Sequence, residues 1–128
     1  MVRKEFGSVY VEIEEPVARF VLNRPEKLNA IDHEMMTGRE EALDWLEDQM
    51  HYTSDGQKEV KVVIVEAEGR AFCAGYDLKA STDRFTPGDE KSISLHDDLE
   101  HHIVQEAKGW HRLWNIAPVT IAKVHGYC

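Results

Sequence analysis

The sequence is poor in cysteine and in basic residues. Its 128 residues include 2 cysteines, Cys73 and Cys128, which are too few for the disulfide framework that stabilises small secreted domains. The 15 Lys and Arg residues are outnumbered by 24 Asp and Glu residues, and the net charge is −9. Because a nucleic-acid-binding surface requires clustered positive charge, this balance argues against nucleic acid as a partner.

Long apolar runs are also absent. The first residues contain no apolar stretch typical of a secretory signal, and every apolar run is much shorter than the roughly 20 residues that span a bilayer. We therefore expect a reduced, cytoplasmic protein with no membrane partner. The apolar content of 42% is sufficient for the core of one domain.

Alternation of residue types predicts a β-hairpin near the start of the chain. Val9, Val11 and Ile13 alternate with more polar residues, as in a strand with one buried face. A second apolar run over residues 17–22 follows a turn at Glu15-Pro16. We expect these two strands to pair.

An amphipathic helix is predicted over residues 32–49. Asp32 is a favourable N-cap residue, and apolar residues recur after it at helical spacing. These residues are Met36, Leu43, Leu46 and Met50. The β-branched run over residues 60–66 then predicts a strand buried on both faces. A strand, a helix and a strand in succession imply a right-handed crossover between parallel strands.

A second helix is predicted to end near Asn115, and a further strand to cover residues 119–124. The apolar stripe of this helix advances in steps of three and four residues. It comprises Leu95, Leu99, Ile103, Ala107, Trp110 and Trp114. Polar composition and turn-forming residues predict connecting loops over residues 51–59 and 81–91.

The strand over residues 60–66 leads into a turn of small residues. Ala71, Ala74 and Gly75 keep side chains away from the backbone, and Gly75 can adopt a conformation that other residues avoid. Such a turn can present backbone N–H groups to a developing negative charge at the end of a sheet. A tight turn without a function is the alternative.

Two basic residues stand close together in the loop before the first helix. Arg24 and Lys27 form a short positive island in an acidic chain, which suits a phosphate group. Ordinary solvated charges are the alternative.

Other chemically capable residues carry weaker signals. The cluster His96, Asp97, Asp98, Glu100, His101 and His102 has metal-ligand chemistry. Since Leu95 and Leu99 belong to the apolar stripe, we expect this cluster on the solvated side of the helix and predict no metal site. Cys73 has no neighbouring base and is not expected to be a nucleophile. We expect Trp110 and Trp114 in the core or a pocket wall, and a structural role for His125.

Three segments together resemble the crotonase superfamily, the enoyl-CoA hydratase/isomerase family. Residues 22–31 (Leu-Asn-Arg-Pro-Glu-Lys-Leu-Asn-Ala-Ile) resemble its signature before the first helix. Residues 69–79 (Gly-Arg-Ala-Phe-Cys-Ala-Gly-Tyr-Asp-Leu-Lys) resemble its first oxyanion-hole segment. Residues 118–128 (Pro-Val-Thr-Ile-Ala-Lys-Val-His-Gly-Tyr-Cys) resemble the strand that leads to its second. The order and separations of the three segments match those of the family. The resemblance extends over the whole chain except residues 81–108.

The resemblance implies an α/β fold, the crotonase-like spiral of ββα repeats with parallel sheet strands and flanking helices. Residues 1–128 would form the N-terminal part of one such domain, and its C-terminal part would come from a complementing fragment or chain. The family also implies a trimer or a dimer of trimers.

The resemblance further implies binding of acyl-CoA thioesters, with coenzyme A as part of the substrate and no resident cofactor. Two backbone N–H groups stabilise the enolate, and the Tyr76 amide would be the first donor. Substrate contacts would come from Arg24, Lys27, Leu28, Ala30, Ala74, Gly75, Tyr76, Asp77, Leu78 and Lys79.

The activity implied first is hydration of a 2-enoyl-CoA thioester. In the family, the second N–H donor comes from a Gly-Gly-Gly run shortly after a segment like residues 125–128, and the catalytic glutamates follow that run. The resemblance therefore implies that both lie beyond Cys128. Glu66, Glu68 and Asp77 are not expected to replace them, since they belong to the strand and its turn. Isomerase, hydrolase and dehalogenase activities remain alternatives, as does a non-catalytic acyl-CoA-binding or interaction subunit.

Overall fold

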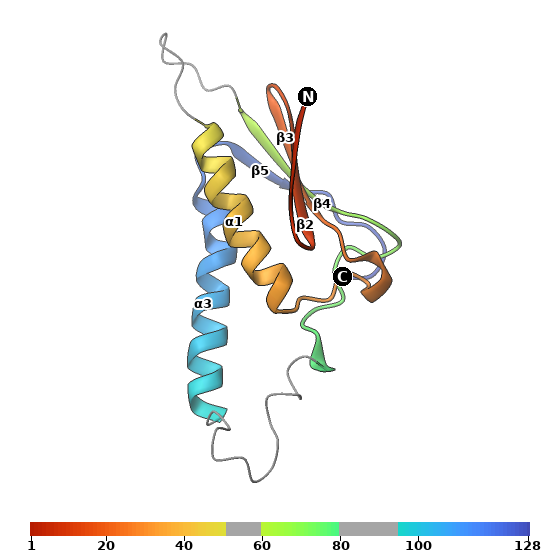
Figure 1. Ribbon diagram of the computed structural model, residues 1–128, viewed down its shortest axis with the longest axis vertical. Coiled ribbons are helices and arrows are strands. Elements are labelled where there is room, and N and C mark those ends of the chain that lie inside the picture. Colours follow the sequence, from red (N-terminus) through yellow and green to blue (C-terminus); the bar gives the residue numbers. More distant parts are fainter. Residues whose placement is uncertain (51–59, 80–94) are drawn as a thin grey trace.

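The computed structural model describes residues 1–50, 60–79 and 95–128, except for the side chains of residues 95–103 and 105. The predicted loops over residues 51–59 and 81–91 therefore lie outside the described residues, as do the side chains of the histidine and carboxylate cluster. The described chain forms one sheet with two long helices against one of its faces (Figure 1).

Five strands form the sheet and follow one another across it in sequence order. The first two pairs of neighbours are antiparallel, and the last two are parallel. The strands are β1 (Val2–Phe6), β2 (Val9–Glu14), β3 (Val17–Leu22), β4 (Val62–Ala67) and β5 (Val119–Ala122). The predicted hairpin and the parallel crossover are confirmed, and the antiparallel start makes the sheet mixed.

The strands differ from the predicted ones in two respects. β1 carries no signal in the sequence because four of its five residues are exposed and only Phe6 is buried. It is held instead by its pairing with β2, which runs along all of β1 from Val2 to Phe6. β5 ends at Ala122 and not at the predicted residue 124, since its pairing with β4 also ends at Ala122.

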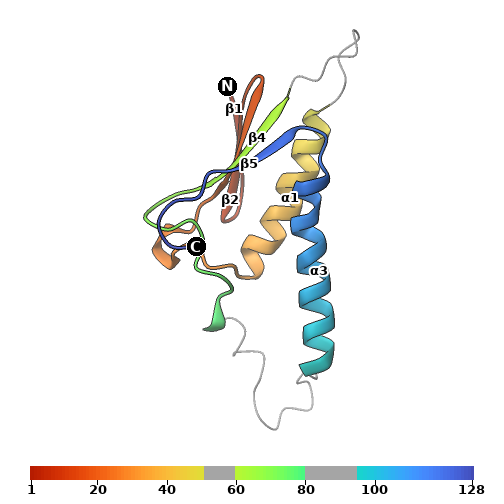
Figure 2. The same ribbon diagram turned by 180° about the vertical axis from the view of Figure 1, so that it is seen from behind.

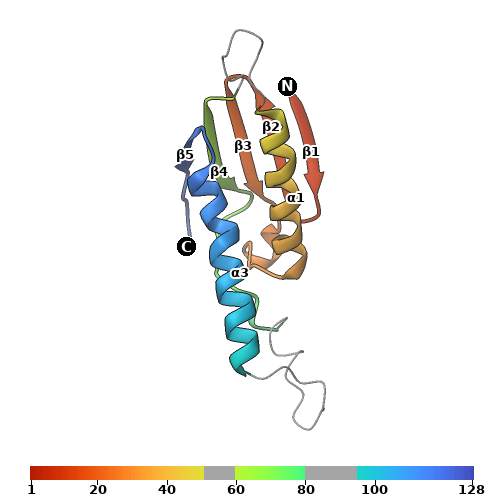
Figure 3. The ribbon, with the colours of Figure 1, turned by 90° about the vertical axis from the view of Figure 1, so that its left-hand side faces the viewer.

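Both predicted helices are present, α1 (His33–Gln49) and α3 (Leu95–Asn115). Asp32 is the N-cap of α1, and its Oδ1 accepts a hydrogen bond of 2.9 Å from the Met35 amide. This bond satisfies one of the free amides at the start of the helix. The two helices run side by side over the same face of the sheet (Figure 3).

The core lies between α1 and the strands it covers. Phe20, Leu43, Leu46 and Val63 are fully buried there. Met35 is also fully buried, whereas the predicted Met36 is only partly buried. A helical stripe has a width of more than one residue per turn, so the sequence identifies the face of the helix better than its central residue.

The prediction that β4 is buried on both faces is wrong. Val63 and Val65 point into the core, but Val62 and Ile64 are only partly buried. In the described residues both helices cover the same face, and the opposite face carries charged side chains. Arg3, Glu12, Arg19, Glu66 and Lys123 form a continuous row of ion pairs across it.

Glu66 is the most buried member of this row, with 8% of its side chain exposed. Burial by itself would raise the pKa of Glu66, but hydrogen bonds from Lys123 and Arg19 outweigh it and lower the pKa. The carboxylate of Glu66 therefore stays charged although it is buried on this face of the sheet, because Arg19 and Lys123 surround it.

Among the described residues, the last strand and the end of α3 expose apolar side chains. Val119 of β5 is 64% exposed, and Trp114 of α3 is 84% exposed. A hollow of about 580 Å³ lies between them, with Trp110 and Phe72 also in its wall. Trp110 also packs partly against the core, and Trp114 lines the hollow, so the prediction of a core or pocket-wall position is confirmed for both residues.

Candidate active site

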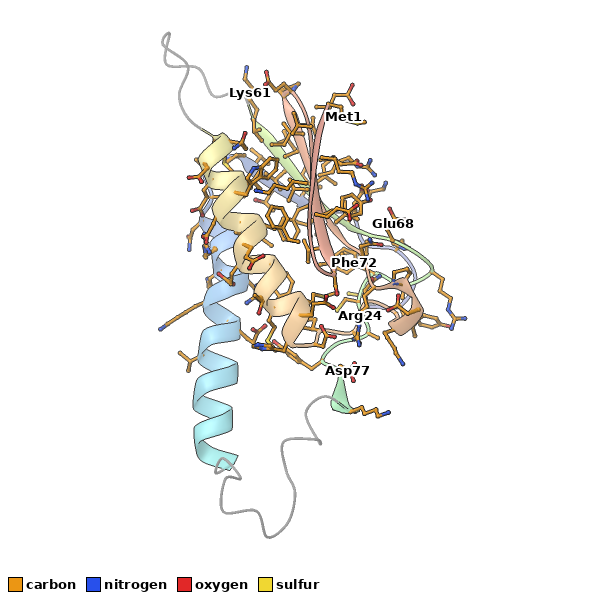
Figure 4. The ribbon with its side chains drawn as sticks, viewed as in Figure 1. Met1, Arg24, Lys61, Glu68, Phe72 and Asp77 are labelled. Carbon is orange, nitrogen blue, oxygen red and sulfur yellow. The ribbon has the colours of Figure 1, made fainter. Side chains whose placement is uncertain are left out.

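The loop after β3 and the turn after β4 lie side by side at one edge of the sheet. β3 and β4 are parallel neighbours that end in register, at Leu22 and Ala67. The segments that follow them therefore leave the sheet at the same place, as the carboxyl ends of parallel strands require. The first contains the 3-10 helix η1 (Pro25–Lys27). Figure 4 shows Arg24 of this loop close to Asp77 of the turn.

Three backbone hydrogen bonds join the two segments. The Ala74 amide donates to the Leu28 carbonyl at 3.0 Å. The Ile31 amide donates to the Gly75 carbonyl at 2.8 Å, and the Asp77 amide returns to the Ile31 carbonyl at 2.8 Å. Ile31 and Tyr76 thus form an isolated parallel bridge, so the geometry of the turn depends on the loop opposite it.

The Tyr76 amide is the predicted first oxyanion donor. Its peptide bond to Gly75 is trans, so its N–H points away from the Gly75 carbonyl. Since that carbonyl faces Ile31, the Tyr76 N–H is directed away from Ile31. No group in the described ranges accepts a hydrogen bond from it, and Tyr76 is 51% exposed. Among the described residues, the turn therefore presents a backbone N–H without an acceptor.

Gly75 allows this arrangement through its backbone conformation. Its φ is +92°, a value that glycine adopts readily and other residues avoid. A Cβ atom at this position would meet no atom within 4 Å. The requirement for glycine is therefore conformational, as the sequence suggested, and not a matter of space.

Arg24 is surrounded by partners of opposite charge. Its Nη1 lies 2.8 Å from Asp77 Oδ2 and 2.9 Å from the Ala30 carbonyl oxygen. Its Nη2 lies 3.1 Å from Asp32 Oδ2. The side chain is 16% exposed, so the guanidinium that the sequence offered for a phosphate group is occupied by groups of the protein itself.

Asn29 is a site residue that the sequence reasoning missed. It is fully buried, with a φ of +54°. Its Nδ2 donates to the carbonyls of Glu68 and Ala71, both at 2.8 Å, and its Oδ1 accepts from the Arg24 amide at 2.7 Å. The available signal was the residue type, because asparagine tolerates a left-handed conformation and bonds nearby backbone in loops.

The other predicted substrate contacts lie on the same two segments. Lys27 is exposed at the end of η1, while Leu28 and Ala30 are partly buried in the loop. In the turn, Ala74 and Lys79 are exposed and Leu78 is 76% exposed. The fold thus brings all the predicted contact positions to one end of the molecule.

The last described residues lie against the start of the same turn. The Phe72 amide donates to the carbonyls of His125 and Tyr127, both at 2.9 Å. Gly126 has a φ of +61°, and a Cβ there would lie 2.0 Å from the Arg70 carbonyl oxygen. His125 Nε2 is 2.8 Å from the Gly69 carbonyl oxygen, which agrees with a structural role. The C-terminus thus lies near the turn (Figure 2).

The phenol of Tyr76 lies close to charged groups of the two helices. Burial raises the pKa of this phenol, and the charge of Glu106 raises it further, against the effects of Arg39 and Trp110. Glu106 itself pairs with Arg39 at 2.8 Å, with 7% and 2% of the two side chains exposed. No local sequence pattern indicates this buried pair, whose partners are 67 residues apart.

Three other features of the described residues concern a nucleophile, a metal site and a membrane span. The Cys73 thiol is partly buried, and its Sγ accepts a contact of 3.4 Å from the Gly75 amide. No group of three or more metal-ligating side chains occurs in the described ranges. Among the described helices, none is long and apolar enough to cross a membrane.

Comparisons with known proteins identify the family of this chain. The enoyl-CoA hydratase/isomerase family model matches residues 12–128. The hydroxycinnamoyl-CoA hydratase-lyase of Pseudomonas fluorescens is 34% identical in an alignment 125 residues long that covers 94% of this chain and 39% of that protein. The 3-hydroxyisobutyryl-CoA hydrolase 1 of Arabidopsis thaliana is 36% identical over 74 residues, covering 58% of this chain and 18% of that protein.

A solved structure gives the same result. An enoyl-CoA hydratase/isomerase from Xanthobacter autotrophicus Py2 superposes with a TM-score of 0.73 and 32% identity, over 94% of this chain and 39% of that chain. The mixed sheet and its helices are those of the crotonase fold. The chain belongs to the enoyl-CoA hydratase/isomerase family, and it spans about two fifths of the length of these two relatives, the hydratase-lyase and the solved structure.

Proposed function

We propose that this chain binds an acyl-CoA thioester and stabilises the negative charge that develops on the thioester oxygen. The supporting observation is the Tyr76 N–H, which the Ile31–Gly75 hydrogen bond directs away from the loop and which has no acceptor within the described ranges. A fixed donor of this kind costs no reorganisation when charge develops. Loss of one such donor typically removes about 3–4 kcal/mol of transition-state stabilisation.

The CoA phosphates would be held locally, in spite of the net charge of −9. Lys27 is the best placed cation for this role because it is exposed beside the joined segments. Arg24 is not available, since two carboxylates already hold its guanidinium. Leu28, Ala30, Ala74 and Leu78 would provide the adjoining contacts for the acyl and pantetheine groups.

The reaction that we propose is hydration of a 2-enoyl-CoA thioester. The family assignment and the names of several relatives support it. Water must be deprotonated and carbon protonated in this reaction, which requires carboxylates at the site. Glu66 is held by Arg19 and Lys123, and Glu68 accepts from Tyr10. We therefore propose that a complementing C-terminal segment supplies the catalytic glutamates and the second N–H donor.

Calorimetric titration and infrared spectroscopy test the binding function directly. Crotonyl-CoA labelled with ¹³C at the thioester carbonyl should bind, and its carbonyl stretch should fall in frequency because the Tyr76 N–H polarises the bond. Lys27→Ala should weaken CoA binding about threefold to tenfold. Lys61→Ala is the matched control, because Lys61 is exposed at the opposite end of the molecule (Figure 4).

Two outcomes would reject parts of this proposal. A bound thioester whose carbonyl frequency equals that in water would remove the oxyanion role. Equal loss of affinity in the Lys27 and Lys61 variants would remove the assignment of Lys27. If the assembly with the C-terminal segment binds crotonyl-CoA but does not hydrate it, the chain is a non-catalytic acyl-CoA-binding subunit.

A further inference from the structure

We propose that Arg24 is a positioning residue that holds the Tyr76 amide in its donor orientation through Asp77. This inference rests on the proposed oxyanion role of that amide. It assigns to Arg24 a task inside the protein in place of contact with a CoA phosphate.

The guanidinium of Arg24 connects three separate parts of the site. Nη1 bonds both Asp77 in the turn, at 2.8 Å, and the Ala30 carbonyl in the loop, at 2.9 Å. Nη2 reaches Asp32 at the start of α1, at 3.1 Å. All three charged side chains are 16–17% exposed. Charge-assisted bonds in such a sheltered place are stronger and more directional than those on an open surface.

These contacts bracket the peptide that carries the proposed donor. Ala30 immediately precedes Ile31, whose amide and carbonyl bond the peptides on both sides of Tyr76. Asp77 immediately follows Tyr76. Arg24 therefore grips one residue next to each partner of the Ile31–Tyr76 bridge. It closes a bridge that consists of one residue pair and is otherwise isolated from the sheet.

The turn requires such an external restraint. Gly75 has no side chain, and no atom lies within 4 Å of the place its Cβ would occupy. Because glycine has the widest conformational freedom of any residue, Gly75 does not by itself fix the orientation of the following peptide. The direction of the Tyr76 N–H thus depends on the hydrogen bonds to Ile31 and on the Arg24–Asp77 pair.

Asp32 links the Arg24–Asp77 pair to helix α1. Its Oδ1 accepts from the Met35 amide at the helix start, and its Oδ2 pairs with Arg24. A planar guanidinium presents several donors in a fixed fork, whereas a lysine ammonium is a point charge on a flexible stem. Lysine at position 24 would therefore keep the charge but lose part of the geometry.

The test compares Arg24→Met and Arg24→Lys with Arg70→Met, which removes the same charge from an exposed neighbouring loop position. We expect Arg24→Met to abolish most of the carbonyl frequency shift of bound ¹³C-crotonyl-CoA, and Arg24→Lys to restore part of it. The affinity for free CoA should stay within about twofold of the wild type. Arg70→Met should retain the full shift.

Two results would overturn the positioning role. One is a full carbonyl shift in Arg24→Met. The other is a large loss of free-CoA affinity with the shift retained in the bound fraction, which would make Arg24 a phosphate ligand. If Arg24→Met does not fold, Asp77→Asn provides the same test, because it keeps the side-chain shape but weakens the pair.

A measurement without ligand separates this proposal from the proposed function. The NMR amide signal of Tyr76 and its ¹⁵N relaxation should change in Arg24→Met and remain as in the wild type in Arg70→Met. An unchanged, rigid Tyr76 amide in Arg24→Met would refute the positioning role of Arg24 even if acyl-CoA binds. If the Tyr76 amide changes in Arg24→Met but the wild-type protein binds no acyl-CoA, the proposed function is refuted and the positioning role of Arg24 is retained.

Discussion

Arg39 of α1 and Glu106 of α3 form a buried ion pair that ties the two helices together. Their closest atoms are 2.8 Å apart, and a second contact of 3.2 Å makes the pair bidentate. The Arg39 guanidinium also lies 4.6 Å from the centre of the Trp110 ring. Gly109 provides the space, since a Cβ there would lie 2.0 Å from Arg39 Nη2.

Removal of one partner of this pair should be strongly destabilising. Arg39→Met should lower the free energy of unfolding by about 3–5 kcal/mol, because the buried Glu106 carboxylate then lacks a compensating charge. Glu106→Gln should lower it less, because Arg39 Nη2 keeps its pair with Glu40 at 2.9 Å. Urea denaturation measures this change. Glu5→Gln is the control, since its exposed pair with Arg3 should contribute at most about 1 kcal/mol. A loss below 1 kcal/mol in both core variants would contradict the burial of the pair.

Substitution of Gly75 should damage the site more than the fold. Gly75→Ala introduces a Cβ at a φ of +92° without a clash, so it should cost about 1–2 kcal/mol of stability through backbone strain alone. The strain should turn the Tyr76 peptide and reduce the carbonyl shift of bound crotonyl-CoA. Gly75→Asn is the comparison, because asparagine tolerates positive φ better. Equal behaviour of both variants would argue against a conformational cause.

Asn29 should be one of the most sensitive polar positions. Asn29→Ala removes three hydrogen bonds and leaves the carbonyls of Glu68 and Ala71 without this donor. We expect a loss of about 2–4 kcal/mol, measured by thermal or urea unfolding. Asn23→Ala, at an exposed position in the same loop, is the control. If Asn29→Ala loses no more stability than the control, the three hydrogen bonds of Asn29 between the two segments contribute little.

Tyr10 should make the stability depend on alkaline pH. Burial and the hydrogen bond to Glu68 raise the pKa of Tyr10 from 10.0 to about 12. Between these pH values the unfolded chain releases the proton first, so the stabilisation that is complete below pH 10 falls as pH rises towards 12. The difference between these two pKa values corresponds to roughly 2–3 kcal/mol of stability.

Denaturation curves across this pH window test the effect. The wild type should lose stability, and Tyr10→Phe should lose less because it has no phenol to titrate. Tyr127→Phe, at a position that is 66% exposed, is the matched control. Identical slopes for the wild type and Tyr10→Phe would rule out Tyr10 as the source of the pH dependence.

Much of the fold follows from local sequence patterns. The hairpin, both helices and the parallel strand order arise from alternation, helical periodicity and capping, which depend on residues close in the chain. β1 escaped prediction because its four exposed residues include three charged ones. The prediction that β4 is buried on both faces is wrong, because burial of a strand depends on where the helices lie and not on its own composition.

The sequence by itself determined the residue types of the site: glycine at position 75, a small-residue turn, and an asparagine and an arginine in the loop before α1. These are properties of single residues and short windows, and the family resemblance rests on them. Only the tertiary structure decided that Arg24 meets Asp77, 53 residues away, and that Arg39 meets Glu106. Such pairs form because parallel strands and packed helices bring distant segments together, and no local pattern encodes which partners will meet.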